Sequence, residues 1–375
     1  MTSTVCEGWT ETDLGSASVI LDNLRVPLSG AQRASRPGPF PYCGANGVLD
    51  HIDDYMIDDD VVLLAEDGGN FDQWRTRPIA YRMKGKIWVN NHAHVLKAAK
   101  TGDTGFLFYA LQHKDITPFI SSGTRSKLTR GELVRIKLLM PEAKEEQRRI
   151  SDSLRDVDDL IATLERLIAK KQAIKQGMMQ QLLTGRTRLP GFASPWSELS
   201  LGSVARIKTG SRNNQDKQAG GKYPFFVRSA TVERIDSYSH DCEAILVPGE
   251  GGIGSIFHYI NGKFEVHQRV YKISDFAPNA SGRFIYYFMR QYFGVHAMEN
   301  SVKATVDSLR LPTFKNFQLR LPSRDEQDAI VCILDDAEAE VAALKARLAK
   351  ARAIKAGMMQ QLLTGRTRLP LESVS

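Results

Sequence analysis

Two long stretches of the chain carry apolar residues at the spacing of an amphipathic helix. Along the first stretch, steps of four and three positions alternate at Ile150, Leu154, Val157, Ile161, Leu164 and Ile168. The second stretch has the same register at Ile330, Leu334, Ala337, Val341, Leu344 and Leu348. Charged residues fill most positions between them, which is the pattern of a coiled-coil seam. We therefore predict two helices of roughly 40 residues, each about 60 Å long at a rise of about 1.5 Å per residue.

The segments outside these helices alternate between strand-like and helix-like patterns. Runs rich in apolar, β-branched and aromatic residues predict strands at 60–66, 86–91, 243–248 and 264–273. Helical patterns follow at 104–114 and 282–293. Prolines precede both long helices, and Thr-Gly pairs followed by prolines end them. The predicted parts are an α/β domain at 1–143, a helix at 144–190, an α/β domain at 191–322, a helix at 323–370 and a tail at 371–375.

One unit of the chain is written twice. The segment GMMQQLLTGRTRLP occupies 177–190 and recurs without a change at 357–370. Trp9 with a following Leu-Gly-Ser matches Trp196 with its own Leu-Gly-Ser. Weaker similarity aligns 65–69 with 248–252, and 85–98 with 262–275. Such self-similarity indicates a duplicated structural unit.

The connections between the elements predict their arrangement. Only Gly-Phe-Ala-Ser separates the end of the first helix from Pro195-Trp196, so the second domain must begin at the far end of that helix. The second helix then returns antiparallel to the first. We predict an α+β fold in which two α/β domains are separated by a two-helix antiparallel coiled coil, with a pseudo-two-fold internal repeat. Two short, isolated bundle helices are the alternative.

Composition narrows the class of protein. The 375 residues are 42% hydrophobic and 25% charged, which is ordinary for a soluble protein of two or three domains. The formal charge of +7 is compatible with a nucleic-acid partner. The four cysteines are scattered without zinc-binding spacing, as in a reduced, cytoplasmic chain. The sequence shows neither a signal peptide nor a membrane-spanning stretch.

No catalytic constellation emerges from the sequence. The glycine run at 249–254 lacks the spacing of a phosphate-binding motif, so a tight turn is the better interpretation. Glu142 and Lys144 form half of a nuclease motif in one unit only, and the acidic stretch at 50–60 is interpreted as a solvated turn. His92 and His94, alternating on a strand, would share one face, where hydrogen bonding to DNA is at least as reasonable as metal binding. We predict no catalytic residue and no metal site.

The paired pattern resembles a known family. Each unit ends with a proline, Glu-Gln-x-x-Ile, a heptad helix and then GMMQQLLTGRTRLP. Together with the Trp…Leu-Gly-Ser openings, this is similar to the specificity subunit of type I restriction–modification enzymes over essentially the whole chain. The resemblance implies that each variable domain is a target recognition domain, which reads one half of a split, asymmetric sequence in double-stranded DNA. It also implies that the helices set the half-site distance and bind two modification methyltransferase subunits, joined by two restriction (translocase/nuclease) subunits.

A shared partner would explain why the repeat is identical, because two copies of one partner need two copies of one docking surface. Completion of the coiled-coil core, or a recent duplication, is the alternative. Methionine and leucine would supply adaptable apolar contacts, with arginines at the rim. The predicted partner-binding residues are Met178, Met179, Leu182, Leu183, Arg186, Arg188, Met358, Met359, Leu362, Leu363, Arg366 and Arg368.

Basic and amide side chains on loops and strand ends are the DNA-binding candidates, because they contact phosphates and base edges. In the first domain they are Arg75, Arg77, Lys84, Lys86, Asn90, Asn91, His92, Arg125 and Lys127. In the second they are Lys208, Arg212, Asn213, Asn214, Lys222, Arg228, Lys263, His267, Arg269 and Lys303. Lys86 aligns with Lys263 and is expected to position the DNA backbone. Asn91-His92 aligns with Gln268-Arg269, where the two domains differ and specificity could lie.

We expect this chain to bind no cofactor itself. The resemblance places S-adenosylmethionine, ATP and Mg on the partner subunits, and implies adenine as the methylated base. Two other classes of protein stay open. One is a stand-alone enzyme that modifies or cleaves DNA, and the other is a coiled-coil scaffold whose globular domains bind peptides.

Overall fold

The computed structural model describes residues 6–121, 126–299 and 308–369. The chain divides into two compact units. The first unit combines residues 1–165 with 346–375, and the second contains residues 166–345. Each unit therefore holds one globular region and a segment of each long helix. Among the described residues, none of the helices has the length and apolar character needed to cross a membrane.

The first unit is built on a six-stranded sheet. Its strand order is β2-β7-β5-β6-β3-β4, and neighbouring strands are antiparallel except β3 and β6, which are parallel. The strands are β2 (Ser18–Ile20), β3 (Pro37–Gly44), β4 (Gly47–Ile52), β5 (Ile57–Ala65), β6 (Ala80–Val89) and β7 (Ala93–Ala98). A two-stranded ribbon pairs β1 (Trp9–Asp13) with β8 (Lys137–Pro141). The shorter helices are α1 (Leu14–Ala17), η1 (Asp22–Leu24), α2 (Gly30–Ala34), η2 (Phe71–Gln73), α3 (Thr104–Gln112), η3 (Thr117–Phe119) and α4 (Arg130–Leu133).

The second unit repeats this topology. Its sheet order, β10-β15-β13-β14-β11-β12, matches the first sheet strand for strand, including one parallel pair between β11 and β14. The strands are β10 (Arg206–Thr209), β11 (Tyr223–Phe226), β12 (Glu233–Ile235), β13 (His240–Pro248), β14 (His258–Val266) and β15 (Val270–Ser274). β9 (Ser197–Ser200) pairs with β16 (Gln318–Leu321) in a ribbon. The shorter helices are α6 (Leu201–Val204), η4 (Asn214–Asp216), α7 (Gly282–Glu299) and α8 (Leu311–Lys315).

The two predicted long helices are α5 (Lys144–Leu182) and α9 (Arg324–Leu362), each of 39 residues. The predicted ends at 190 and 370 are wrong, because the chain leaves the helical conformation at the left-handed Gly185 and Gly365. Within the first unit, Lys355 contacts Asp158 and Arg352 contacts Glu165, both at 2.7 Å. Within the second unit, Lys171 contacts Glu340 at 2.7 Å and Lys175 contacts Glu338 at 3.0 Å. In both units the residue number of the partner on α9 falls as the residue number on α5 rises. The paired helix segments are therefore antiparallel, as predicted.

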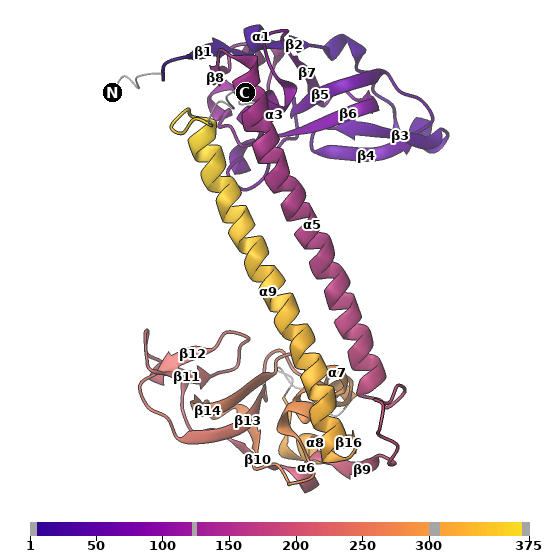
Figure 1. Ribbon diagram of the computed structural model, residues 1–375, viewed down its shortest axis with the longest axis vertical. Helices are drawn as coiled ribbons and strands as arrows, with labels where there is room; N and C mark the ends of the chain where they lie inside the picture. Colours follow the sequence, from indigo (N-terminus) through magenta and orange to yellow (C-terminus); the bar gives the residue numbers. More distant parts are fainter. Residues whose placement is uncertain (1–5, 122–125, 300–307, 370–375) are drawn as a thin grey trace, which may run out of the picture. The chain divides into compact units, whose positions relative to one another are not determined.

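The first turns of the long helices belong to the cores of the globular regions. Ile150 and Leu154 of α5 pack in one core with Trp9 and Phe106. Ile330 and Leu334 of α9 have the corresponding place in the second unit. In Figure 1, α3 lies beside the first part of α5, where the Tyr109 hydroxyl donates to Asp158 at 2.8 Å. The apolar register of each long helix thus continues directly into a globular core.

Three predictions made from the sequence are corrected by the structure. The run at 264–273 is not one strand, because β14 ends at Val266 and β15 begins at Val270. His92 lies in the matching turn of the first unit while His94 lies on β7, so they do not share a strand face. The acidic stretch at 50–60 is a turn only between β4 and β5, and its last three aspartates lie in β5, directly after Ile57. Short polar turns inside apolar runs are hard to separate from strand by alternation alone.

Candidate nucleic-acid interface

Three turns of the first unit meet around one cavity. They are the β3–β4 turn at 45–46, the loop after β5 at 67–69 and the β6–β7 turn at 90–92, which we call the first turn cluster. The Asn90 N–H donates to the Cys43 carbonyl at 3.0 Å, and the Glu66 N–H donates to the His92 carbonyl at 2.8 Å. The cavity is open to solvent and has a volume of about 640 Å³. Segments far apart in sequence are therefore joined through their backbones.

The side chains of the first turn cluster are held in defined orientations. Asn90 is only 4% exposed, and its Oδ1 accepts the N–H of His92 at 2.9 Å. The Nδ1 of His92 lies 2.6 Å from Oδ1 of Asp67. Asn46 donates from Nδ2 to the Gly68 carbonyl at 2.8 Å. Since Nδ1 is engaged, Nε2 is the ring nitrogen of His92 that a ligand can reach.

The second unit contains an equivalent set of turns, at 228–229, 250–252 and 267–269, which we call the second turn cluster. The His267 N–H donates to the Phe226 carbonyl at 3.0 Å, and the Gly249 N–H donates to the Arg269 carbonyl at 2.9 Å. A smaller cavity of about 220 Å³ lies here, lined in part by Arg228 and His267. Positive φ angles at Gly251 and Gly252 explain the glycine run, which forms a tight turn as predicted.

One acid in the second turn cluster orients two arginines. Arg228 lies 3.2 Å from one carboxylate oxygen of Glu250, and Arg269 is ion-paired with the other. About half of each guanidinium side chain is exposed. His267 is buried, and its Nδ1 accepts the Arg269 N–H at 3.0 Å. Burial and the charges of both arginines lower the pKa of His267, which favours the neutral ring that can accept this bond.

The two turn clusters share a construction and differ in chemistry. In each, a buried polar residue accepts the N–H of the residue two positions later, whose side chain pairs with an acid in the glycine loop. Asn90, His92 and Asp67 in the first unit correspond to His267, Arg269 and Glu250 in the second. The alignments of 85–98 with 262–275, and of 65–69 with 248–252, are thereby confirmed. The backbone is kept while the side chains at the rim change.

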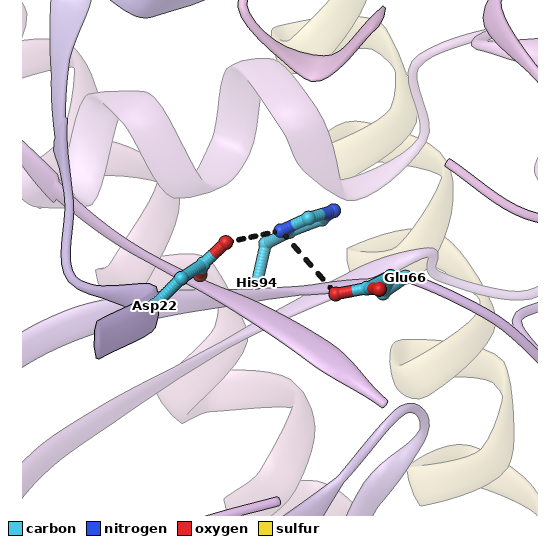
Figure 2. Close-up of side chains that lie close together, drawn as sticks. All are labelled: Asp22, Glu66 and His94. Atoms are coloured by element: carbon cyan, nitrogen blue, oxygen red, sulfur yellow. Dashed lines mark hydrogen bonds and ion pairs between the residues drawn. The ribbon is translucent and has the colours of Figure 1, made fainter. Parts of the chain in front are cut away.

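A second polar group of the first unit joins two acids and a histidine (Figure 2). Nδ1 of His94 lies 2.7 Å from Asp22 and 3.7 Å from Glu66, and its Nε2 lies 2.9 Å from the Leu128 carbonyl. The His94 side chain is 1% exposed. Both ring nitrogens of His94 therefore face oxygen acceptors of the chain itself.

Cations of the chain already neutralise the two acids. Arg25 lies 3.3 Å from Asp22 and 2.5 Å from Glu66, and Lys127 lies 2.9 Å from Glu66. Burial alone would raise the pKa of Asp22, but hydrogen bonds from His94 and the Val95 N–H, with the charges of His94 and Arg25, lower it overall. The pKa of Glu66 is likewise lowered, against its burial, by Arg25, Lys127 and His94. A site already supplied with cations has little attraction for a metal.

The second unit supports a structural interpretation of this group. The position of His94 is occupied there by Tyr271, whose hydroxyl donates to the Leu309 carbonyl at 3.3 Å, as His94 does to Leu128. The position of Glu66 is Gly249, where a side chain would come within 2.9 Å of the Tyr271 ring. The second unit therefore keeps the hydrogen bond to the leucine carbonyl, but it has no counterpart of the possible metal ligands Glu66 and His94. We interpret Asp22, Glu66 and His94 as a structural group that stabilises the fold of the first unit.

The structure brings some of the predicted DNA-binding residues of the first unit together. Asn90, Asn91 and His92 form one turn of the first turn cluster, and Lys127 bridges to Asp67 beside it. The other candidates lie elsewhere or outside the described residues. Arg75 stacks over Trp74, and Arg77 follows the same η2 segment. Lys84 and Lys86 lie on β6, and Lys86 stacks over Tyr55. Arg125 is outside the described residues.

The second unit shows the same division. Arg228, His267 and Arg269 belong to the second turn cluster, and Gln268 donates to Asn213 at 2.5 Å. Arg212 and Asn214 are therefore also near it, with Arg212 ion-paired to the buried Glu265. Lys208, Lys222 and Lys263 lie on or beside β10, β11 and β14, and Lys303 lies outside the described residues. Lys263 stacks over Tyr238 much as Lys86 stacks over Tyr55, which supports their alignment.

The repeated segment has a clear role within each unit. Arg188, after α5, makes a two-pronged ion pair with Glu326 in the first turn of α9, both N–O distances being 2.7 Å. Arg368, after α9, does the same with Glu146 at 2.9 and 2.6 Å. The preceding glycines have φ near +70° and lie against tryptophan rings, Gly185 on Trp196 and Gly365 on Trp9. We call each Arg–Glu–Trp–Gly set a clasp.

These contacts account for much of the repeat. Met179, Leu182, Leu183 and Leu362 are buried in the cores of their own units, and Met178, Met358, Met359 and Leu363 pack partly against them. Arg188 and Arg368 form the clasps. Arg186 and Arg366 are exposed. Core packing, which was the alternative explanation of the repeat, therefore holds for most of these positions, and binding of a partner by the twelve residues stays a prediction.

Several important residues were not singled out from the sequence. Asp67 and Glu250 each stand in an aligned glycine loop, and that alignment was the available signal. The Glu-Gln pairs are visible in the sequence only as repeated motifs. Gln147 accepts the Asp103 N–H at 2.9 Å and Gln327 accepts the Ser281 N–H at 2.8 Å, so each glutamine ties its helix to the globular region.

The fold and the two turn clusters define a class of protein in which one domain is present twice. Each copy is joined to the long helices, and the two copies have different side chains at equivalent sites. Comparison with known proteins identifies the family. The sequence matches the family described as Type I restriction modification DNA specificity domain at residues 7–176 and again at 193–352. The chain therefore belongs to this family, that of the type I specificity subunits that its sequence resembles, and it carries two copies of the domain.

Named relatives and a solved structure agree with this assignment. A Haemophilus influenzae protein, named as a type I restriction enzyme specificity subunit, is 26% identical over 350 residues, covering 87% of this chain and 86% of that protein. The EcoDI specificity subunit of Escherichia coli is 31% identical over 169 residues, 45% of this chain and 37% of that protein. The type I S subunit from M. genitalium has a similar fold, with a TM-score of 0.73 over 96% of this chain and 97% of that one, at 14% identity.

Proposed function

We propose that this specificity subunit reads a bipartite, asymmetric DNA sequence, each globular region reading one half. The observation that carries the proposal is the pair of turn clusters. Their backbones are held by the same hydrogen bonds, while His92 and Asp67 in one are replaced by Arg269 and Glu250 in the other. A reader of two different half-sites needs one scaffold with two sets of contacting groups.

The paired helices serve two purposes in this proposal. They set the distance between the half-sites, and they dock two methyltransferase subunits through equivalent surfaces that include Arg186 and Arg366. Two restriction subunits complete the complex in the cytoplasm. This chain performs no chemistry, and S-adenosylmethionine, ATP and Mg act on the partner subunits.

A methylation map tests the proposal. The chain is expressed together with the methyltransferase genes of its own locus in a host without other methylation, and the genome is sequenced for modified bases. We expect one split, asymmetric motif that is methylated only when this chain is present. Retention of the motif without the chain, or absence of any motif with all partners expressed, would contradict the proposal.

The purified chain separates this proposal from a stand-alone enzyme and from a scaffold. An enzyme would methylate DNA with S-adenosylmethionine, or cut it with Mg, without other subunits. A scaffold would show no sequence-selective affinity for DNA. We expect no modification or cleavage by the chain alone, and DNA binding that weakens as salt rises, because phosphate contacts release counterions.

A further inference from the structure

We propose that Arg228 and Arg269 read a guanine in the half-site of the second unit, with Glu250 orienting both guanidinium groups. His92, held by Asp67, takes the corresponding reading position in the first unit. This inference rests on the proposed function and assigns the base contacts that the function requires.

The position is identified by comparing the two units. His92 and Arg269 are equivalent because each makes the same three contacts. The carbonyl group of each accepts a hydrogen bond from the N–H of the residue that follows β5 or β13, and the N–H of each donates to a buried side chain two positions earlier. The side chain of each pairs with the acid in the glycine loop. The supporting atoms are constant and the presented group is not. That combination is expected where one scaffold reads two sequences.

The presented chemistry in the second unit fits guanine. Guanine exposes two acceptors, N7 and O6, in the major groove, and the planar fork of an arginine donates to both at once. Glu250 shares its two carboxylate oxygens between Arg228 and Arg269, so the pair keeps a net positive charge. About half of each side chain is exposed, which leaves N–H groups free to approach a base. Pre-orientation by an acid reduces the entropy lost on binding.

The first unit offers a different set of groups at the same place. His92 presents one ring nitrogen, Nε2, rather than a two-donor fork, because Nδ1 is engaged by Asp67. The exposed Leu49 and the buried Phe71 line the same cavity and form an apolar wall. Apolar side chains contact the thymine methyl group, and a two-donor contact to guanine is not available from an imidazole. The bases read at the equivalent positions of the two half-sites should therefore differ.

The experiment measures base preference in the assembled complex of the full chain with its methyltransferase subunits. Methylation rates are compared on duplexes that carry each single-base substitution of the mapped target. We expect Arg269→Gln and Arg228→Gln to lose discrimination at that guanine by roughly 5- to 150-fold, the usual value of a two-donor contact. All other positions should keep their preference. Arg269→Lys, which keeps the charge but not the fork, should also lose it.

Control variants separate base reading from general binding. Arg206, on β10, is exposed and ion-paired with Asp275, so Arg206→Gln removes a similar charge away from the second turn cluster. We expect it to leave the base preference unchanged. His92→Gln should alter preference only in the other half-site. Thermal unfolding of each variant shows that the fold is retained.

Two results would overturn the inference. In the first, the arginine variants methylate with wild-type base preference. In the second, they reduce methylation equally at every substituted target, which would show that the arginines contact phosphates. Either result leaves the proposed function intact, because the wild-type complex still methylates a split motif. Failure of the proposed function is a separate outcome, in which the wild-type complex shows no sequence preference.

Discussion

At the scale of single residues, the clasps explain the second arginine of each repeat, Arg188 and Arg368. Glu146 and Glu326 are 3% and 1% exposed, although each is charged. A buried carboxylate is tolerated only when a cation and hydrogen bonds satisfy it, and the second arginine of each repeat does this with two bonds. The second arginine of each repeat therefore meets an internal requirement of its own unit, whereas partner binding by the exposed Arg186 and Arg366 stays a prediction.

Loss of the carboxylate charge should destabilise one unit at a time. Glu326→Gln weakens two charge-assisted hydrogen bonds, and we expect a loss of about 2 kcal/mol in the free energy of unfolding of the second unit. Glu146→Gln should have the same effect on the first unit. Glu145 is exposed in the same helical turn, so Glu145→Gln is the matched control. Urea unfolding measures all three, and equal stabilities for the variants and the control would contradict the role of the clasps.

The Asp22–Glu66–His94 group provides a test with metal ions. Because Arg25 and Lys127 already pair with the two acids, we expect Zn²⁺ or Mg²⁺ to leave the thermal unfolding midpoint unchanged, and EDTA likewise. A metal that bound only the folded state would raise the midpoint as its concentration increased. A midpoint that rose with Zn²⁺ and fell with EDTA would show that the group is a metal site.

At the scale of elements, polar contacts fix where the long helices meet the globular regions. In the second unit, Tyr287 of α7 donates to Asp335 at 2.5 Å and to Glu338 at 2.9 Å, both on α9. Glu338 also contacts Lys175 of α5 and Arg290 of α7. One carboxylate thus links three helices. The apolar seam predicts that the helices pair, but these contacts set which residues of α7 they meet.

Acid should weaken this junction. Burial would raise the pKa of Glu338, but hydrogen bonds from Lys175 and Tyr287 and the charges of Lys175 and Arg290 lower it from 4.5 to about 2. Since the folded pKa lies below the unfolded value, the stabilisation is present above pH 4.5 and is lost as the pH falls towards 2. Unfolding of the chain from pH 6 to about pH 2.5 measures the loss.

A variant identifies the group responsible for this pH dependence. Glu338→Gln should lower stability at neutral pH and flatten its fall in acid. Glu340 is an exposed residue of the same helix and is ion-paired with Lys171. Glu340→Gln therefore provides the control. If Glu338→Gln kept the full wild-type slope below pH 4.5, another group would be responsible.

At the scale of the whole molecule, two units of the same topology carry different side chains at their turn clusters. Each unit has its own core, its own clasp and its own six-stranded sheet. Exchange of residues 1–140 for the first domain of another family member should therefore change one half of the recognised DNA sequence. We expect the methylated motif to keep its other half unchanged. A change in both halves, seen by methylation mapping, would contradict independent reading.

Much of this organisation follows from the sequence by itself. Periodicity of 3.6 or 3.5 residues is local information, so the two helices, their apolar seam and their starting residues were predictable, although both helices end before the predicted 190 and 370, at Leu182 and Leu362. The internal repeat predicted two domains of one fold, whereas the apolar run at 264–273 predicted a single strand and missed the turn between β14 and β15. The resemblance to the family also came from these motifs, because a repeated motif can be recognised in the sequence without the tertiary structure.

Only the tertiary structure decided which polar residues act together. The His92–Asp67 pair is separated by 25 positions, and the two clasps join residues 138 and 222 positions apart. No local pattern predicts such partners, because they meet only when the strands and helices pack. The structure also divided the basic candidates between the turn clusters and other places, since a side chain's position depends on where its strand ends. Charge and type were visible in the sequence, whereas proximity and burial were not.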